Sequence, residues 1–254
     1  SELGAGLNIG ISWRGGRIES TIKSRSTPLS LWESVLKSGA NFINLQYGDC
    51  IEEINQVKES LGVSINDWAD ADPLKDLDNF AAQITALDLV ISVDNSTVHF
   101  AGALGTPVWV LLPFAPEWRW FLHRDDSPWY PSVRLFRQKK LDAWESVFEE
   151  VIKSLKLHDR QIQITTDLTT LLTATINAFR VNAIPEGHKK LIALLELLAS
   201  HTTMLSEEKV LKLKMLLNKI LKELEQKNYD AITETLEKEI ATLLNLSLEK
   251  ALLS

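Results

Sequence analysis

The stretch LVISVDNSTVHFAGALGTPVWVLL, residues 89–112, decides the fold of this chain. Residues 89–93 and 108–112 are short apolar runs rich in β-branched side chains, the pattern of strands that are buried on both faces of a parallel sheet. Between them, polar residues 94–97 predict a turn ending in a helix N-cap, and the helix that follows ends at Gly105, ahead of Pro107. The stretch therefore predicts a strand–loop–helix–strand unit of a doubly wound sheet.

The loop at residues 94–97 is also the first candidate for a ligand site. Backbone N–H groups point out of the N-terminus of a helix, where a phosphate or another anion is favoured. An ordinary capped connection between a strand and a helix has the same residue pattern. The sequence of this loop alone therefore does not distinguish a ligand-binding role from a structural role. The other loops are needed to distinguish them.

The composition is that of a globular protein, with 45% hydrophobic and 24% charged residues in a chain of 254. A net charge of -7 argues against a nucleic-acid partner. The single cysteine, Cys50, excludes an internal disulfide and a cysteine-based zinc cluster. No apolar run reaches about 18 residues and no signal-peptide pattern is found, so we expect no membrane span and a cytoplasmic location.

The composition changes near residue 160. All eight tryptophans, seven of the eight prolines and ten of the eleven glycines come before it. We therefore predict two domains, residues 1–160 and 161–254, with a protease-accessible connection at residues 158–166. The second domain contains four amphipathic stretches, the first running from an N-cap at Asp167 to Arg180, which predict an all-α helical bundle. Such a bundle would recruit a protein partner or form an oligomer.

In the first domain, predicted strands alternate with predicted helices, the last of these helices covering residues 141–155. This alternation indicates an α/β fold with a mainly parallel, Rossmann-like sheet, whose ligand lies beyond the carboxyl ends of the strands. Four polar loops follow predicted strands and should meet there: residues 14–16, 46–48, 94–97 and 113–120.

Five segments of this domain together resemble the C-terminal half of the heptosyltransferase-like glycosyltransferases of family 9, particularly those joined to tetratricopeptide repeats. They are IGISWRGG (residues 9–16), RSTPLSLW (25–32), NLQYGD (44–49), DLVISVDNSTVHFAGALGTPVWVLLPFAPEWRW (88–120) and DDSPWYPSVRLFRQ (125–138). The resemblance implies the donor-binding half of a GT-B enzyme, which holds a nucleotide-sugar. It also implies metal-independent transfer of a hexosyl or heptosyl group, with no cofactor besides the donor substrate.

With this resemblance, the loops around the predicted helix N-terminus become candidates for the donor diphosphate. The candidates are Arg14, Gly15, Asn95, Ser96, Thr97 and His99. The backbone N–H groups of Ser96 and Thr97 would bind the phosphates. His99, one turn into the helix, would donate a proton or hydrogen bond to them, or else pack as an ordinary first-turn histidine. Arg14 would supply positive charge, with Arg25 as a further candidate.

The sugar, ribose and base would contact a second set of side chains, Gln46, Asp94 and Trp118. Asp94 would repel a diphosphate, so we expect it to accept hydrogen bonds from loop N–H groups or from sugar hydroxyls. Gln46 would contact the ribose or the base. Trp118 and Trp120 would face the base or sugar or fill the core of their own loop, and we expect at least one of them to pack. The rim carboxylates offer no pair that identifies a catalytic base.

The resemblance covers about residues 8–157, whereas a GT-B enzyme also needs an N-terminal half that supplies the acceptor contacts and the base. We expect the chain to be a fragment, to obtain that half from another chain, or to have lost catalysis. The predicted function is therefore a glycosyltransferase donor domain acting toward an unknown glycan, lipid or protein acceptor. The alternative is a non-catalytic binding or assembly module whose helical tail recruits a partner.

Overall fold

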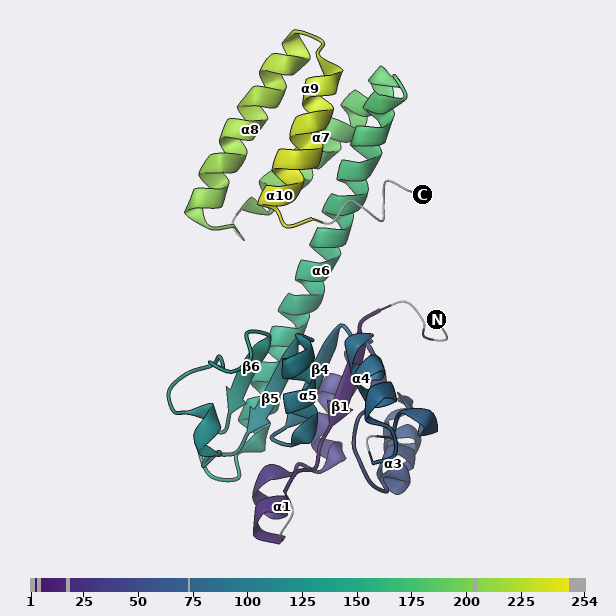
Figure 1. Cartoon of the computed structure of the whole chain (residues 1–254), viewed down its shortest axis with the longest axis vertical. Helices are drawn as coiled ribbons and strands as arrows, with labels where there is room; N and C mark the ends of the chain where they lie inside the picture. The colour runs from purple at the N-terminus through teal and green to yellow at the C-terminus, as the bar shows by residue number, and fades with distance from the viewer. Residues whose placement is uncertain (1–2, 4–5, 17–18, 73, 203–204, 247–254) are drawn as a thin grey trace. The chain divides into compact units, whose positions relative to one another are not determined.

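The computed structural model describes residues 3, 6–16, 19–72, 74–202 and 205–246, and the chain divides into two compact units, Ser1–Leu157 and His158–Ser254. The first unit is a Rossmann-like α/β domain and the second is helical (Figure 1). The predicted fold class, a mainly parallel sheet followed by an all-α region, is confirmed.

Six parallel strands form the sheet of the first unit. They are β1 (Asn8–Ser12), β2 (Asn41–Asn44), β3 (Ile65–Asn66), β4 (Leu89–Val93), β5 (Val108–Leu112) and β6 (Val133–Arg137). Their order across the sheet is β3-β2-β1-β4-β5-β6. In this doubly wound order the sheet grows outward in opposite directions from β1 and β4, so these two strands mark the switch point where such folds bind ligands.

Helices cover the sheet on both faces. Those of the first unit are α1 (Glu19–Arg25), η1 (Leu29–Trp32), α2 (Glu33–Leu36), α3 (Ile51–Leu61), η2 (Ala69–Ala71), α4 (Leu77–Thr85), α5 (Ser96–Leu104), η3 (Trp118–Trp120) and the beginning of α6 (Trp144–Arg180). α4 and α5 lie side by side on one face (Figure 1), where Val98 of α5 packs with Val90 of β4. Leu89 and Ile91 of β4 flank Val90 in the chain and therefore point to the opposite face of the sheet. Both are 0% exposed, so that face is covered as well.

The stretch at residues 89–112 folds as its sequence predicts. Asn95 is the N-cap of α5, and its side chain accepts a hydrogen bond from the backbone N–H of Thr97. Gly105 ends the helix in the left-handed conformation, with φ of 76°. Glycine adopts this conformation without the steric cost that a Cβ imposes.

Two helical segments near the N-terminus differ from the prediction. The sequence after Pro28 indicates one helix over residues 29–37, but these residues form the 3-10 turn η1 followed by the short α2. The sequence also gave no indication of α1, because its residues, ESTIKSR, contain a single apolar side chain, Ile22, which is 43% exposed. A helix without an apolar stripe leaves no periodic signal.

The second unit is a bundle with one continuous hydrophobic core. Besides the later part of α6, it contains α7 (Ile184–Ser200), α8 (Glu207–Glu225), α9 (Tyr229–Glu234), the π-helical segment η5 (Thr235–Ile240) and α10 (Ala241–Leu243). All of these elements contribute buried apolar side chains to that core. None of the described helices is both long enough and apolar enough to cross a membrane.

Secondary structure does not break at residues 158–166, and protease accessibility there stays a prediction. The helices expected at 141–155 and 167–180 belong to one helix of 37 residues, α6. No glycine or proline interrupts it, and Asp167 accepts a hydrogen bond from the Gln163 side chain one turn earlier, at 2.9 Å, instead of capping a new helix. The change in composition therefore does not coincide with a break in secondary structure.

Candidate functional site at the switch point of the sheet

The loops that follow β1 and β4 lie against each other at the switch point. Ser12 and Ser92 are paired across the two strands. Beyond them the backbones approach so closely that a Cβ on Gly15 would lie 2.8 Å from the carbonyl oxygen of Asp94. Glycine is therefore required at this position, and two of the four predicted loops meet as expected.

Asn95 joins these two loops and serves the fold. Its Nδ2 donates to Oγ of Ser12 at 2.7 Å and to the carbonyl oxygen of Arg14 at 2.9 Å. Its Oδ1 accepts from the backbone N–H of Thr97 at 3.0 Å. Because Asn95 is 8% exposed and both ends of its amide are bonded inside the chain, it clamps the crevice rather than presenting a group to a phosphate.

Gln46 has a similar structural role at the end of β2. Its Oε1 accepts hydrogen bonds from the backbone N–H groups of Trp13, at 3.0 Å, and Arg14, at 2.7 Å. Its Nε2 donates to the carbonyl oxygen of Tyr47 at 3.1 Å. Gln46 is 5% exposed and both ends of its amide are bonded within the chain, so its contact with ribose or base stays a prediction. In the structure Gln46 fixes the path of the loop after β1.

Thr97 and Ser96 differ in what they leave open to a ligand. Thr97 is 1% exposed, and its backbone N–H is already bonded to Asn95, so the predicted free donor at this position is wrong. Ser96 is exposed at the first position of α5. The open part of the helix N-terminus is therefore at Ser96.

Arg14 points toward the β2–α3 connection. Its Nη2 donates to the carbonyl oxygen of Asp49 at 2.7 Å, and its Nη1 lies 3.3 Å from a carboxylate oxygen of Glu53. The side chain keeps 35% of its surface exposed. Its charge is thus shared with α3, and it is no longer the first candidate for the diphosphate.

Asp94 is a buried carboxylate at the centre of the site. The residue is 2% exposed, and its Oδ2 has no hydrogen-bond partner among the described residues. The nearest cation is Arg25 at the end of α1, whose Nη1 lies 3.8 Å away and which also forms an ion pair with Glu117. Burial raises the pKa of Asp94 above its ordinary value, while Trp120, Arg25, Arg119 and His99 act in the opposite direction. Two guanidinium groups and an imidazole therefore lie around one carboxylate.

His99 is neutral and bonded at both ring nitrogens. Nη1 of Arg119 lies 3.0 Å from its Nε2, and the hydroxyl of Tyr130 lies 3.2 Å from its Nδ1. A guanidinium can only donate, so Nε2 accepts and Nδ1 carries the proton. Burial lowers the pKa of His99, and the charge of Arg119 lowers it further. His99 therefore holds Arg119 in place, and the predicted direct proton donation to phosphate is not what this geometry favours.

Sequence reasoning missed Arg119 and Tyr130. The available signal was an arginine between two tryptophans in EWRW, residues 117–120. At least one of the two tryptophans was expected to pack, and Trp120 does, since it is 0% exposed. Trp118 is 73% exposed. Trp118 thus remains free to contact a ligand at the rim.

A cavity of about 200 Å³ lies at the carboxyl ends of β2 and β3. It is lined by Asn44, Leu45, Gln46, Gly48, Asp49, Cys50, Ile51, Asp67, Trp68, Ala71, Asp72 and Lys75. Burial raises the pKa of the Cys50 thiol, which keeps it protonated. In the described part of the chain, no group of three or more His, Cys, Asp or Glu side chains is arranged to hold a metal ion.

The fold and the site define the first unit as a doubly wound α/β domain with basic side chains at its switch point. No family model matches the chain. It is 41% identical over 156 residues to Protein FlbA of Caulobacter vibrioides, a match covering 61% of this chain and 26% of FlbA, so the chain spans about a quarter of that relative. Among solved structures, glutamyl-tRNA reductase from Methanopyrus kandleri is similar over 92% of this chain and 58% of its own, with 12% identity. Its TM-score is 0.25, too low to support an argument.

Proposed function

We propose that the first unit is the donor-binding domain of a nucleotide-sugar-dependent glycosyltransferase. The observation that carries the proposal is the position of Arg25, Arg119 and the first turn of α5 around the crevice between β1 and β4. Doubly wound sheets bind their ligands at this point. The resemblance of residues 8–157 to heptosyltransferase-like glycosyltransferases of family 9 supports the same role.

The diphosphate of the donor would bind at the N-terminus of α5. Guanidinium groups bind phosphate oxygens through paired N–H donors, and the helix dipole favours negative charge at Ser96. Arg25 is held by Glu117, so a phosphate would replace that carboxylate as its partner. Arg119 is oriented by His99 and would stabilise the charge of the leaving diphosphate without a metal ion.

The remaining parts of the donor have candidate contacts at the same edge of the sheet. The cavity at the ends of β2 and β3 would take the ribose and base, with Asp49 as an acceptor for ribose hydroxyls. The exposed indole of Trp118 would pack against the sugar ring. Oδ2 of Asp94, which has no hydrogen-bond partner among the described residues, would accept a hydrogen bond from a sugar hydroxyl.

Transfer would require groups that these loops do not supply. A base must reach the acceptor hydroxyl, and a second wall must exclude water from the donor. In the resembled family both come from the N-terminal half. We therefore expect this chain alone to bind a nucleoside diphosphate with micromolar to millimolar affinity and to transfer no sugar to a glycan, lipid or protein.

A second candidate function, recruitment of a partner, rests on the helical unit. Leu211 and Met215 lie one turn apart on α8 and are 63% and 66% exposed. Large apolar side chains exposed together on one helix face are typical of surfaces that bind another protein. The partner would be another protein or a second copy of this chain.

Calorimetric titration of the 254-residue chain with ADP, UDP, GDP and CMP tests the donor-binding proposal. We expect at least one of the diphosphates to bind and Arg119→Leu to weaken that binding about tenfold or more. Arg124→Leu is the matched control, since Arg124 lies on the same loop and its guanidinium pairs with the exposed Asp126. No binding at millimolar concentration, or equal losses in the two variants, would contradict the proposal.

A further inference from the structure

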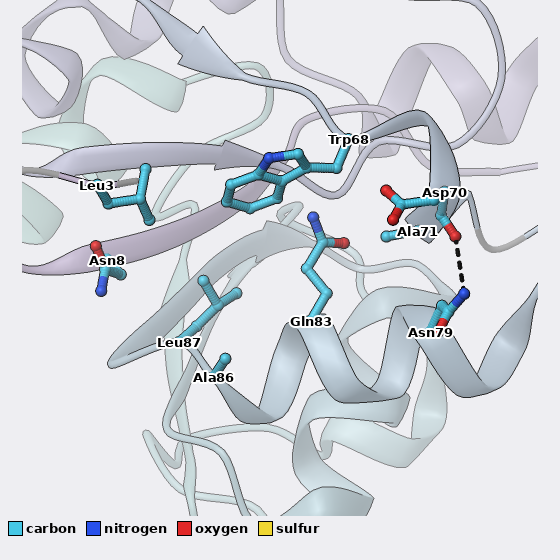
Figure 2. A pocket seen from close by; sticks show the side chains of 9 residues that line it. All are labelled: Leu3, Asn8, Trp68, Asp70, Ala71, Asn79, Gln83, Ala86 and Leu87. Carbon is cyan, nitrogen blue, oxygen red and sulfur yellow. Dashed lines mark hydrogen bonds between the residues drawn. The ribbon is translucent and has the colours of Figure 1, made fainter. Parts of the chain in front are cut away.

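A second and larger cavity, of about 340 Å³, lies beside α4 in the first unit. Figure 2 shows its lining: Leu3, Asn8, Trp68, Asp70, Ala71, Asn79, Gln83, Ala86 and Leu87. Asn8 begins β1 and Leu87 precedes β4, so the cavity reaches the amino edge of the sheet, opposite to the edge that carries the candidate donor site. Trp68 and Ala71 line this cavity and also the smaller one at the carboxyl ends of β2 and β3.

Gln83 is the polar group that gives this cavity a chemical preference. Both Oε1 and Nε2 are buried and have no hydrogen-bond partner in the described part of the chain. In Figure 2 the amide rises from α4 toward the indole of Trp68. A buried amide without partners destabilises a fold, so native structures nearly always satisfy such groups. The cavity is where a partner for both atoms can enter.

The edge of a primary amide places an N–H donor next to a carbonyl acceptor. Its complement is a group with an acceptor next to a donor, as on the edge of a nucleobase, and glutamine recognises adenine in this way. The amide of Asn79 cannot serve the same purpose, since it donates to Asp70 and Asp76 within the chain.

The walls favour a flat, uncharged body. Trp68 lies across the cavity from Leu87, and Ala86 and Leu3 extend the apolar surface (Figure 2). An indole packs well against a planar ring. Asp70 is the ionisable side chain among the described lining residues, so no cation is present there to bind a phosphate. The volume suits a small ligand.

We propose that this cavity binds a neutral nucleobase or nucleoside, with Gln83 pairing with the base edge and Trp68 packing against the ring. The site shares Trp68 and Ala71 with the cavity proposed for the donor's ribose and base, but of the two cavities Gln83 lines this one alone, whereas the donor site relies on arginines for a diphosphate. A phosphate group on the same base should weaken binding here, whereas it should strengthen binding at the N-terminus of α5.

Calorimetric titration of the full chain with adenosine, guanosine, cytidine and uridine, and with their 5′-monophosphates, tests this proposal. We expect at least one nucleoside to bind and Gln83→Leu to weaken its binding about tenfold or more. Gln56→Leu on α3 is the matched control, since it makes the same change at an exposed position and should leave binding unchanged. Leucine is close in size to glutamine and removes an unpaired amide, so the melting temperature of Gln83→Leu should stay the same or rise.

The outcomes separate the two sites. Arg119→Leu should leave nucleoside binding unchanged, and Gln83→Leu should leave diphosphate binding unchanged. If no nucleoside binds at millimolar concentration, or if Gln83→Leu folds and binds as the parent does, the proposal is wrong. A lower melting temperature for Gln83→Leu without nucleoside binding to the parent would show that the cavity holds water alone.

Discussion

Nε2 of His99 on α5 lies 3.0 Å from Nη1 of Arg119 in η3, so a neutral imidazole holds a guanidinium at the rim of the sheet. Because arginine only donates, this hydrogen bond exists only while Nε2 of His99 carries no proton. Protonation would replace it with a contact between two positive charges. The charge of His99 therefore controls whether Arg119 keeps its position.

The first prediction concerns the pH dependence of stability. Burial and Arg119 hold the pKa of His99 below its ordinary value of 6.5, so the folded state binds the proton more weakly than the unfolded state. The contribution of His99 is then fully present above about pH 6.5 and is lost as the pH falls through the lower pKa of the folded state. Urea unfolding should show this loss in the parent and a smaller one in His99→Gln. NMR titration should also give a higher pKa for His99 in Arg119→Leu, and an imidazole in the parent that titrates at or above 6.5 would contradict the geometry.

The second prediction concerns Asp94, for which the sign is reversed. Burial raises its pKa above 3.8, so the folded state binds the proton more tightly than the unfolded state. Its favourable contribution is present below about pH 3.8 and is lost as the pH rises through the raised pKa. Asp94→Asn should therefore increase the free energy of unfolding at pH 7. Asp126→Asn, at an exposed carboxylate paired with Arg124, is the control and should change little. A large destabilisation by Asp94→Asn would show that Arg25 more than compensates the buried charge.

The third prediction separates the two tasks of Asn95. Asn95→Ala removes the helix cap and leaves the carbonyl oxygen of Arg14 without this donor, which should cost about 2–4 kcal/mol of unfolding free energy. Asn95→Ser can still cap α5 but is too short to reach Arg14, so it should recover about 1 kcal/mol of that loss. Urea titrations of the three proteins give the comparison. If Asn95→Ser were as stable as the parent, the bond to Arg14 would contribute nothing.

The fourth prediction tests the packing of the helical unit. A Cβ on Gly187 of α7 would lie 2.5 Å from Cε1 of Phe179 on α6. Alanine favours a helix over glycine by about 1 kcal/mol, but forcing the aromatic ring aside should cost about 1–3 kcal/mol. We expect Gly187→Ala to lower the thermal transition followed by circular dichroism, whereas Lys189→Ala, at an exposed position of α7, should leave it nearly unchanged. A higher transition temperature would mean that Phe179 has room to move.

The mainly parallel sheet and most elements could be predicted because their signals are local. The apolar runs at β4 and β5, the cap at Asn95 and the left-handed Gly105 each follow from a few adjacent residues. The prediction failed at Asp167, where a capping residue type occurs inside α6. An aspartate can bond to a side chain one turn away as readily as to a helix N-terminus, and the sequence does not distinguish the two.

The sequence predicted where the site lies in the fold, but it did not predict which side chains contact one another there. Polar residues after strands identified the loops, yet Asn95 and Gln46 use their amides on neighbouring backbone groups. Amide side chains after a strand can bind a ligand or can hold neighbouring backbone groups together, so their presence in the sequence does not separate these two roles. Arg119 and Tyr130 reach His99 from 20 and 31 positions away, because the segment between β5 and β6 folds back over α5. A contact between residues so far apart in the chain leaves no pattern in the adjacent sequence.

The clamp at the switch point also imposes an order on biosynthesis. The hydrogen bonds from Trp13 and Arg14 to Gln46 span 33 and 32 positions, whereas those from Asn95 to Arg14 and Ser12 span 81 and 83. A growing chain can therefore pair β1 with β2 and lock that pair before β4 has been synthesised, and the closure of longer loops carries a larger entropic cost. Until β4 arrives, β1 presents an unpaired edge that other strands can join. The crevice is thus completed late in synthesis. The edge of β1 stays unpaired until β4 has been made, and Asp94 and the start of α5 follow β4 directly.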